Sequence, residues 1–241
     1  MRGGAGRSRV RSRSGLSDGP ERDSGTSPLA PPLRSREVFS RIARRYDAVN
    51  RVLSLGSDGV WRRAAIAHLP AGLVLDLGAG TGAANREFGT RRVVALDPEV
   101  AMLAFNAQRR RVAGYGEHLP FAGGSFDGVF SAFVFRNIDS IPATLAEIHR
   151  VLRPGGAAAI VDLSRPVAAW QRGLHRAGTA VVLAVVGALA GSLREYWYLH
   201  RSLDALRPPQ VLFGEGSLAL ERLWRMGPFG FVYGVVLRKE G

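Results

Sequence analysis

The chain has 241 residues and is 46% hydrophobic, so we expect a single domain with a sizeable core. It contains no cysteine, which excludes disulfide bonds, thiolate metal sites and thiol nucleophiles. Its net charge of +13 comes almost wholly from arginine and would suit nucleic acid or an anionic membrane, but it equally fits a compositional preference for arginine, so charge alone selects no function.

Residues 1–36 differ in composition from the rest of the chain. They are rich in Arg, Ser, Gly and Pro, and eight arginines against three acids give this stretch a net charge of +5. Such a stretch buries too little apolar surface to offset its ordering entropy, so we predict a disordered tail and one folded domain over residues 37–241. The tail has no apolar h-region and is not a secretory signal. A solvated tail is the simplest interpretation, with a transit peptide or a nucleic-acid-binding tail as alternatives.

The first predicted elements of the domain are N-terminal helices. Apolar residues recur at helical spacing from Val38 to Tyr46, which predicts an amphipathic lid helix. The motifs S-x-G at residues 54–56 and W-R-R at residues 61–63 follow. Taken alone, these residues indicate only a lid and a core tryptophan.

A buried strand and a glycine-rich turn occupy residues 73–82, which read LVLDLGAGTG. The four apolar positions predict a strand buried on both faces, and Gly78, Gly80 and Gly82 allow a sharp turn and a close approach to a ligand. Asp76, just before the turn, can accept hydrogen bonds from loop amides or from a ligand ammonium. Strand, glycine turn and helix form the arrangement that holds nucleotides in doubly wound α/β folds.

A second predicted strand ends in an acid. The connecting helix is expected at residues 83–88, and residues 93–96 (VVAL) form a strand that leads to Asp97. An acid in this place can bind both hydroxyls of a ribose. The spacing resembles the first two motifs of class I S-adenosylmethionine methyltransferases. The alternative is a glycine turn of purely structural role with an exposed Asp97, because a lone glycine-rich loop is weak evidence.

The rest of the chain adds the elements of an α/β fold. We expect the arginine run at residues 109–111 to lie at a solvated helix C-terminus and an amphipathic helix at residues 142–152. Strands are predicted at residues 128–134, 157–161 and 229–237. The order predicts an α/β fold with a doubly wound, mostly parallel sheet, N-terminal lid helices and an apolar helical insertion before the last strands.

Several motifs together resemble the ubiquinone/menaquinone biosynthesis C-methyltransferase family. One is F-x-x-I-A-x-x-Y-D-x-x-N at residues 39–50, which precedes the S-x-G and W-R-R motifs. Others are the strings at residues 115–127 and 162–166 and the pair Arg136-Asn137, which generic methyltransferases lack. The resemblance runs from about Val38 to Leu203.

The resemblance implies a class I fold and an S-adenosylmethionine-dependent enzyme without a metal. The residues that match the donor-binding positions of the family are Asp76, Gly78, Gly80, Thr81, Gly82, Asp97, Tyr115 and Gly116. Three positions depart from the family pattern: Ala83 replaces an acid, Tyr115 a polar residue and Ala132 a serine.

The implied reaction places a methyl group on a ring carbon of a prenylated hydroquinone in quinone biosynthesis, with a demethylmenaquinol-like acceptor. That carbon becomes nucleophilic when a ring hydroxyl loses its proton, so the enzyme has to position the reactants and stabilise the phenolate. We expect Arg136 to face the phenolate oxygen and Asn137 to orient the ring. Tyr46 would close the lid, and either Tyr46 or a water that it holds would relay the proton. Asp162 is a weaker candidate for the base.

Residues 177–193 form a charge-free stretch of 17 residues. As a helix it would be ~25 Å long, short of the ~30 Å hydrocarbon core of a bilayer. We interpret it as an apolar lid over the prenyl chain or a segment that dips into one leaflet. The protein is therefore expected to be cytoplasmic, with peripheral contact to a membrane surface through this stretch.

Two other functions stay open at this stage. The first is a class I methyltransferase for another small molecule. The second is a catalytically inactive protein that binds the donor or associates with a membrane, an alternative that the three departures motivate. A nucleic-acid methyltransferase rests only on charge, so no nucleic-acid partner is expected, and a homodimer stays open.

Overall fold

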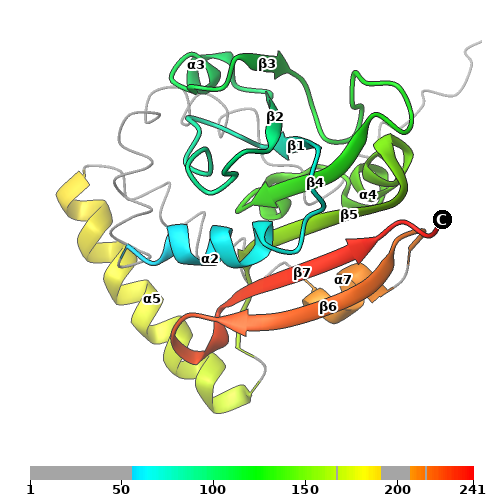
Figure 1. Ribbon diagram of the computed structural model, residues 1–241. Coiled ribbons are helices and arrows are strands. Elements are labelled where there is room, and N and C mark those ends of the chain that lie inside the picture. Colours follow the sequence, from blue (N-terminus) through cyan, green and yellow to red (C-terminus); the bar gives the residue numbers. More distant parts are fainter. Residues whose placement is uncertain (1–55, 167, 191–206, 215) are drawn as a thin grey trace, which may run out of the picture.

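The computed structural model describes residues 56–166, 168–190, 207–214 and 216–241 (Figure 1). The tail at residues 1–36 and the lid segment that contains Tyr46 lie outside the described residues. The helices are α2 (Asp58–Ile66), α3 (Val100–Leu103), α4 (Ile141–Val151), α5 (Ala169–Ala190) and α7 (Pro209–Gly214), with 3-10 turns η1 (Phe135–Asn137) and η2 (Pro228–Gly230).

A seven-stranded sheet in the order β3-β2-β1-β4-β5-β7-β6 forms the centre of the molecule (Figure 1). Its strands are β1 (Leu73–Leu77), β2 (Arg92–Asp97), β3 (Arg110–Ala113), β4 (Phe126–Ala132), β5 (Leu152–Leu163), β6 (Ala219–Met226) and β7 (Val232–Arg238). The first five pair in parallel, whereas β7 lies antiparallel between β5 and β6. The predicted doubly wound, mostly parallel sheet is therefore confirmed.

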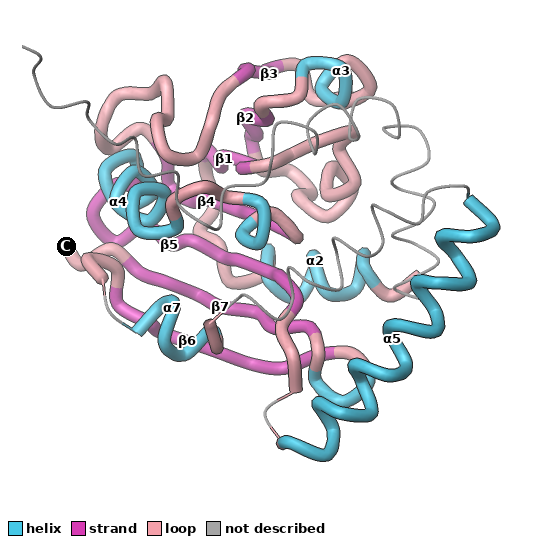
Figure 2. Tube along the Cα trace, turned by 180° about the vertical axis from the view of Figure 1, so that it is seen from behind, coloured by secondary structure: helices cyan, strands magenta, loops and turns pink. Residues whose placement is uncertain are grey.

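Helices cover both faces of this sheet. Trp61 and Ile66 of α2 are buried in an apolar cluster with Phe130 of β4 on one face. On the opposite face, Ile148 of α4 and Phe213 of α7 are buried in a second cluster, and Figure 2 shows both helices on that side. Two apolar layers around one sheet give the strands the continuous burial that their sequences predict.

Two local predictions are wrong. Residues 83–88 form consecutive turns and no helix, and two glycines of positive φ, Gly82 and Gly89, border the stretch on both sides. The arginine run does not end a helix, because α3 stops at Leu103 and Arg110 and Arg111 belong to β3. β3 is an edge strand, where charged side chains discourage pairing with another chain.

The end of the sheet also differs from the prediction. β5 begins at Leu152 rather than at residue 157, with a register shift against β4 near its start. β7 spans Val232–Arg238, and its partner β6 is a strand that the sequence analysis did not predict. The exposure of β6 explains the omission, because its first four residues are all exposed and give no alternating pattern.

The apolar insertion forms the long helix α5, which continues to Ala190, so residues 191–193 of the predicted stretch lie outside the described residues. Figures 1 and 2 both show α5 beside the sheet, extending away from the other helices. Among the described residues, no helix is long and apolar enough to cross a membrane.

Candidate active site

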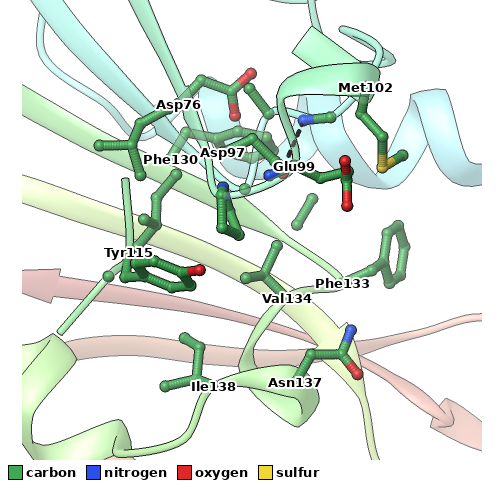
Figure 3. A pocket seen from close by; sticks show the side chains of 18 of the residues that line it. Asp76, Asp97, Glu99, Met102, Tyr115, Phe130, Phe133, Val134, Asn137 and Ile138 are labelled. Carbon is green, nitrogen blue, oxygen red and sulfur yellow. Dashed lines mark hydrogen bonds between the residues drawn. The ribbon is translucent and has the colours of Figure 1, made fainter. Parts of the chain in front are cut away.

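A cavity lies at the carboxyl ends of β1, β2 and β4. In doubly wound sheets the ligand crevice opens at this edge. Asp76 and Asp97 lie on one side of the cavity, and Tyr115, Asn137 and Ile138 lie on the other (Figure 3).

The glycine-rich turn after β1 passes close to the segment that follows β4. Gly78 has φ +74°, and its amide donates a 2.8 Å hydrogen bond to the carbonyl of Leu96. A Cβ on Gly78 would lie 2.2 Å from Cγ2 of Val134. Gly80 also has a positive φ, of 50°. Only glycine fits at position 78, because both the backbone angle and the space exclude a side chain.

Asp97 fixes this turn to the end of β2. One carboxylate oxygen accepts a 2.9 Å hydrogen bond from the amide of Gly80, and the other accepts a 2.9 Å bond from the amide of Glu99. Burial raises the pKa of Asp97, and these two backbone hydrogen bonds oppose the rise. The carboxylate is therefore a fixed acceptor at the rim of the cavity, not the exposed acid of the structural alternative.

Asp76 carries a buried oxygen that lacks a hydrogen-bond partner. The residue is 2% exposed, and its Oδ2 accepts no hydrogen bond from the described residues. Burial raises the pKa of Asp76 to about 7, against the lowering effect of Arg62. Because buried polar atoms are nearly always paired, an orphaned carboxylate oxygen that lines a cavity indicates a ligand with a hydrogen-bond donor.

The segment after β3 closes the side of the cavity opposite Asp76. Tyr115 is 43% exposed and Gly116 is buried. A Cβ on Gly116 would lie 3.0 Å from Cγ2 of Thr144, so the backbone packs tightly against α4 here. Tyr115 thus presents an aromatic ring to the cavity in the place of the usual polar residue.

Arg136 and Asn137 of η1 point in different directions. Asn137 lines the cavity. Arg136 has a side chain that is only 7% exposed, and its guanidinium lies 3.4 Å from the carboxylate of Asp162, which is completely buried. Burial raises the pKa of Asp162 and Arg136 lowers it. The pair therefore holds a buried guanidinium close to, but not among, the side chains that line the cavity.

The structure brings most of the predicted donor-binding residues together. All of them except Gly82 line the cavity. Gly82 instead shapes the turn, with φ +89° and a 2.9 Å hydrogen bond from its amide to the carbonyl of Ala79. The departures at Ala83 and Ala132 also line the cavity, whereas the predicted catalytic Tyr46 lies outside the described residues.

Among the cavity residues that sequence reasoning missed are Arg62 and Phe133. Arg62 is 6% exposed and lies with its guanidinium carbon 5.2 Å from the centre of the Phe133 ring. Phe133 is the one described residue other than glycine with a positive φ, of 63°. The W-R-R motif was the available signal for Arg62, but the sequence does not show which of its two arginines is buried.

Comparison with known proteins assigns the family. The sequence profile of the ubiE/COQ5 methyltransferase family matches residues 32–213. The chain belongs to this family. It is 43% identical over 212 residues to the demethylmenaquinone methyltransferase of Thermobifida fusca, with 81% of this chain and 90% of the relative covered. The ubiE/COQ5 resemblance predicted from the motifs is thereby confirmed, and the chain is a methyltransferase.

Two further relatives agree with this assignment. The demethylmenaquinone methyltransferase of Mycolicibacterium gilvum is 39% identical over 72% of this chain and 80% of its own length. The ubiquinone/menaquinone biosynthesis C-methyltransferase UbiE of Geotalea daltonii is 34% identical over 70% of this chain and 79% of its own length.

Solved structures confirm the fold of this ubiE/COQ5 methyltransferase. A chain of the complex between the Haloferax volcanii Trm112 methyltransferase activator and a methyltransferase superposes with a TM-score of 0.60 at 20% identity, covering 84% of this chain and 98% of its own. An S-adenosylmethionine-dependent methyltransferase from Thermotoga maritima superposes with a TM-score of 0.58 at 16% identity, covering 85% and 99%. At these identities the likeness concerns the fold alone.

Proposed function

We propose that this ubiE/COQ5 methyltransferase transfers a methyl group from S-adenosylmethionine to a ring carbon of a prenylated, demethylmenaquinol-like hydroquinone. The observation that carries the proposal is the Arg136-Asn137 pair, which distinguishes the quinone-methylating family: Asn137 lines the cavity after β4, and Arg136 precedes it in η1. The names of the relatives support the acceptor class.

Two features of the cavity fit the proposed donor. The turn at Gly78 leaves bare backbone where a Cβ would clash, as a nucleotide-binding loop requires. The orphaned oxygen of Asp76 suits the ammonium group of the donor, and the fixed carboxylate of Asp97 lies where a ribose is held in such folds. When bound, the donor supplies an electrophilic methyl group on a sulfonium.

The residues of η1 divide the remaining tasks. Asn137, in the cavity wall, orients the acceptor through a hydrogen bond to a ring hydroxyl. Arg136 stabilises the phenolate charge from its buried position, where a positive charge is screened far less than in water. Asp162 holds the guanidinium in place, and its complete burial favours this role over direct removal of the ring proton.

The prenyl chain requires an apolar path, and we propose that α5, which contains most of the apolar stretch at residues 177–193, provides peripheral contact with a membrane surface. Trp170 and Leu174, one turn apart near the start of α5, are 68% and 54% exposed. An exposed tryptophan and leucine on one helix face suit the interfacial region of a bilayer. Homodimer formation and the lack of a nucleic-acid partner stay predictions.

Substitution of Arg136 tests the proposed function. Arg136→Ala is expected to lower turnover of a prenylated hydroquinone by about 100-fold or more, because the developing phenolate loses its counter-charge. The affinity for S-adenosylmethionine, measured by calorimetry, should be unchanged. Arg222→Ala, at an exposed position on the edge strand β6, is the matched control and should affect neither quantity.

Each outcome of this experiment has a definite meaning. Full turnover in Arg136→Ala removes the proposed role of Arg136. Binding of S-adenosylmethionine without turnover of any quinol in the unaltered protein would instead favour the catalytically inactive alternative, for which Ala83 and Ala132 in the cavity wall are the structural reason.

A further inference from the structure

Arg62 is a buried arginine to which the proposed function assigns no role. It lies in α2, lines the cavity and is 6% exposed. Its guanidinium donates a hydrogen bond to Asp58, four residues earlier on the same helix. Among the described residues this is the one hydrogen bond that Arg62 makes, so most of its N–H donors are still available.

Two neighbours hold the Arg62 guanidinium in place. Asp58 pairs with one of its nitrogens, and the guanidinium carbon lies over the ring of Phe133, 5.2 Å from the ring centre. Phe133 is itself fixed by a 2.7 Å hydrogen bond from its amide to Val161 and by edge contact with Trp61. A strained backbone that survives beside a cavity is typical of functional sites, and here it sets the ring that orients Arg62.

The cavity wall thus contains a buried cation and a buried acid at separate positions. Arg62 and Asp76 influence each other electrostatically, but among the described residues they form no direct ion pair. Asp76 retains an oxygen without a partner, and Arg62 retains N–H donors. A buried carboxylate oxygen without a partner is costly, so the orphaned oxygen of Asp76 and the remaining N–H donors of Arg62 are together complementary to a ligand that carries both an ammonium group and a carboxylate.

We propose that Arg62 binds the carboxylate of the α-amino acid portion of the methyl donor, while Asp76 binds its ammonium group. This assignment rests on the proposed donor. Residues of α2 and of the end of β1 then bind the two charged groups of the amino acid portion. Arg62 becomes a specificity-determining residue, because it favours the donor and its demethylated product over adenosine compounds that lack a carboxylate. A guanidinium suits this task because it pairs with a carboxylate in bidentate geometry.

Binding measurements on two ligands isolate the carboxylate. S-adenosylhomocysteine carries the complete amino acid portion, and its decarboxylated analogue differs only by the carboxylate. Titration calorimetry on the full chain should show that the unaltered protein prefers S-adenosylhomocysteine by about thirtyfold or more, as expected for a buried charge pair. Arg62→Gln should lose this preference and leave the affinity for the decarboxylated analogue within about threefold.

The neighbouring arginine provides a matched control. The Arg63 side chain is 70% exposed and pairs with Glu87 on the surface, so Arg63→Gln should change the affinity for neither ligand. Asp76→Asn should lower the affinity for both ligands by the same factor, because both carry the ammonium group. Arg62→Lys retains the charge and should retain part of the preference, which keeps the test valid if Arg62→Gln folds poorly.

The outcomes separate the two proposals. Equal affinity of the unaltered protein for the two ligands, or a preference that survives in Arg62→Gln, overturns the role of Arg62 and leaves the proposed donor intact. If the unaltered protein binds none of S-adenosylhomocysteine, its decarboxylated analogue and 5′-methylthioadenosine, both the proposed donor and the role of Arg62 are overturned. Loss of the preference in Arg62→Gln alone, with unchanged binding of the decarboxylated analogue, supports it.

Discussion

Asp76 links ligand binding to stability at the scale of a single residue. Burial raises its pKa from 3.8 to about 7 in the folded protein. Between these values the folded protein holds a proton that the unfolded chain has lost, so the free energy of unfolding falls as the pH rises from about 4 to about 7. Without its ligand, the protein thus loses unfolding free energy at neutral pH, because the buried carboxylate proposed to bind the ammonium group is ionised there.

Asp76→Asn should remove both the energetic cost of the buried carboxylate and its role in ligand binding. Between pH 5 and pH 8 the unaltered protein should lose about 3 kcal/mol of unfolding free energy that the variant retains. Urea unfolding of the ligand-free proteins at the two pH values measures the difference. The variant should also bind S-adenosylhomocysteine more weakly. Parallel pH profiles for the two proteins would show that Asp76 titrates normally.

At this scale the residue types at the site were largely predictable from the sequence. Two acids stand at the ends of β1 and β2, with glycines between them. Their spacing along the chain is sufficient to recognise them from the sequence alone. Arg62 could not be assigned, because its burial depends on α2 packing against the segment after β4, far away in sequence. The direction of Arg136, toward Asp162, depends in the same way on β5.

At the scale of elements, the turn after β1 and the segment after β4 depend on each other. Gly78 and Val134 are in such close contact that a Cβ on Gly78 would lie 2.2 Å from the valine side chain. Both residues line the cavity, so a change that pushes the two segments apart would widen it.

Gly78→Ala should therefore cost more than backbone strain alone. Gly124 has a similar φ of +64° against +74° for Gly78, but a Cβ on Gly124 would meet nothing within 4 Å. Gly124→Ala should cost about 1 kcal/mol of unfolding free energy, the usual cost of a left-handed backbone. Gly78→Ala should cost about 2 kcal/mol more and abolish donor binding, because it also creates overpacking. Equal urea midpoints for the two variants would contradict the steric part of this account.

Elements with a clear hydrophobic period were predicted well, and those without one were not. β1, β2 and α4 have their predicted positions to within a residue or so, because their apolar residues follow the sheet or helix repeat. β3 and β6, both edge strands, carry exposed and charged residues that hide them from such patterns. The expected helix at residues 83–88 is replaced by turns between two glycines of positive φ, Gly82 and Gly89.

At the scale of the whole molecule, the sheet order places the site. β1 lies between β2 and β4, so the carboxyl ends of all three open into one cavity. Local patterns do not predict that order, since strand order depends on contacts between distant segments, and the family resemblance implied only a doubly wound, mostly parallel sheet. α5 lies beside this sheet (Figure 2). Its residues Trp170 and Leu174 are exposed.

The proposed membrane contact predicts a selective loss of lipid binding. The double substitution Trp170→Gln and Leu174→Gln should reduce sedimentation with phosphatidylglycerol vesicles about tenfold or more, because both apolar groups are removed from the same helix face. Leu220→Gln, at another exposed apolar residue on β6, is the control and should retain binding. Equal sedimentation of all three proteins would show that α5 does not form the membrane contact.

Methyl transfer to carbon is the central claim, and isotope labelling tests it most directly. The purified protein is incubated with demethylmenaquinol and S-adenosylmethionine that carries a labelled methyl group, and the lipid product is analysed by tandem mass spectrometry. The account predicts one labelled methyl group on a ring carbon of the quinone. A label on oxygen, or an unlabelled quinone beside a competent donor-binding site, would contradict it.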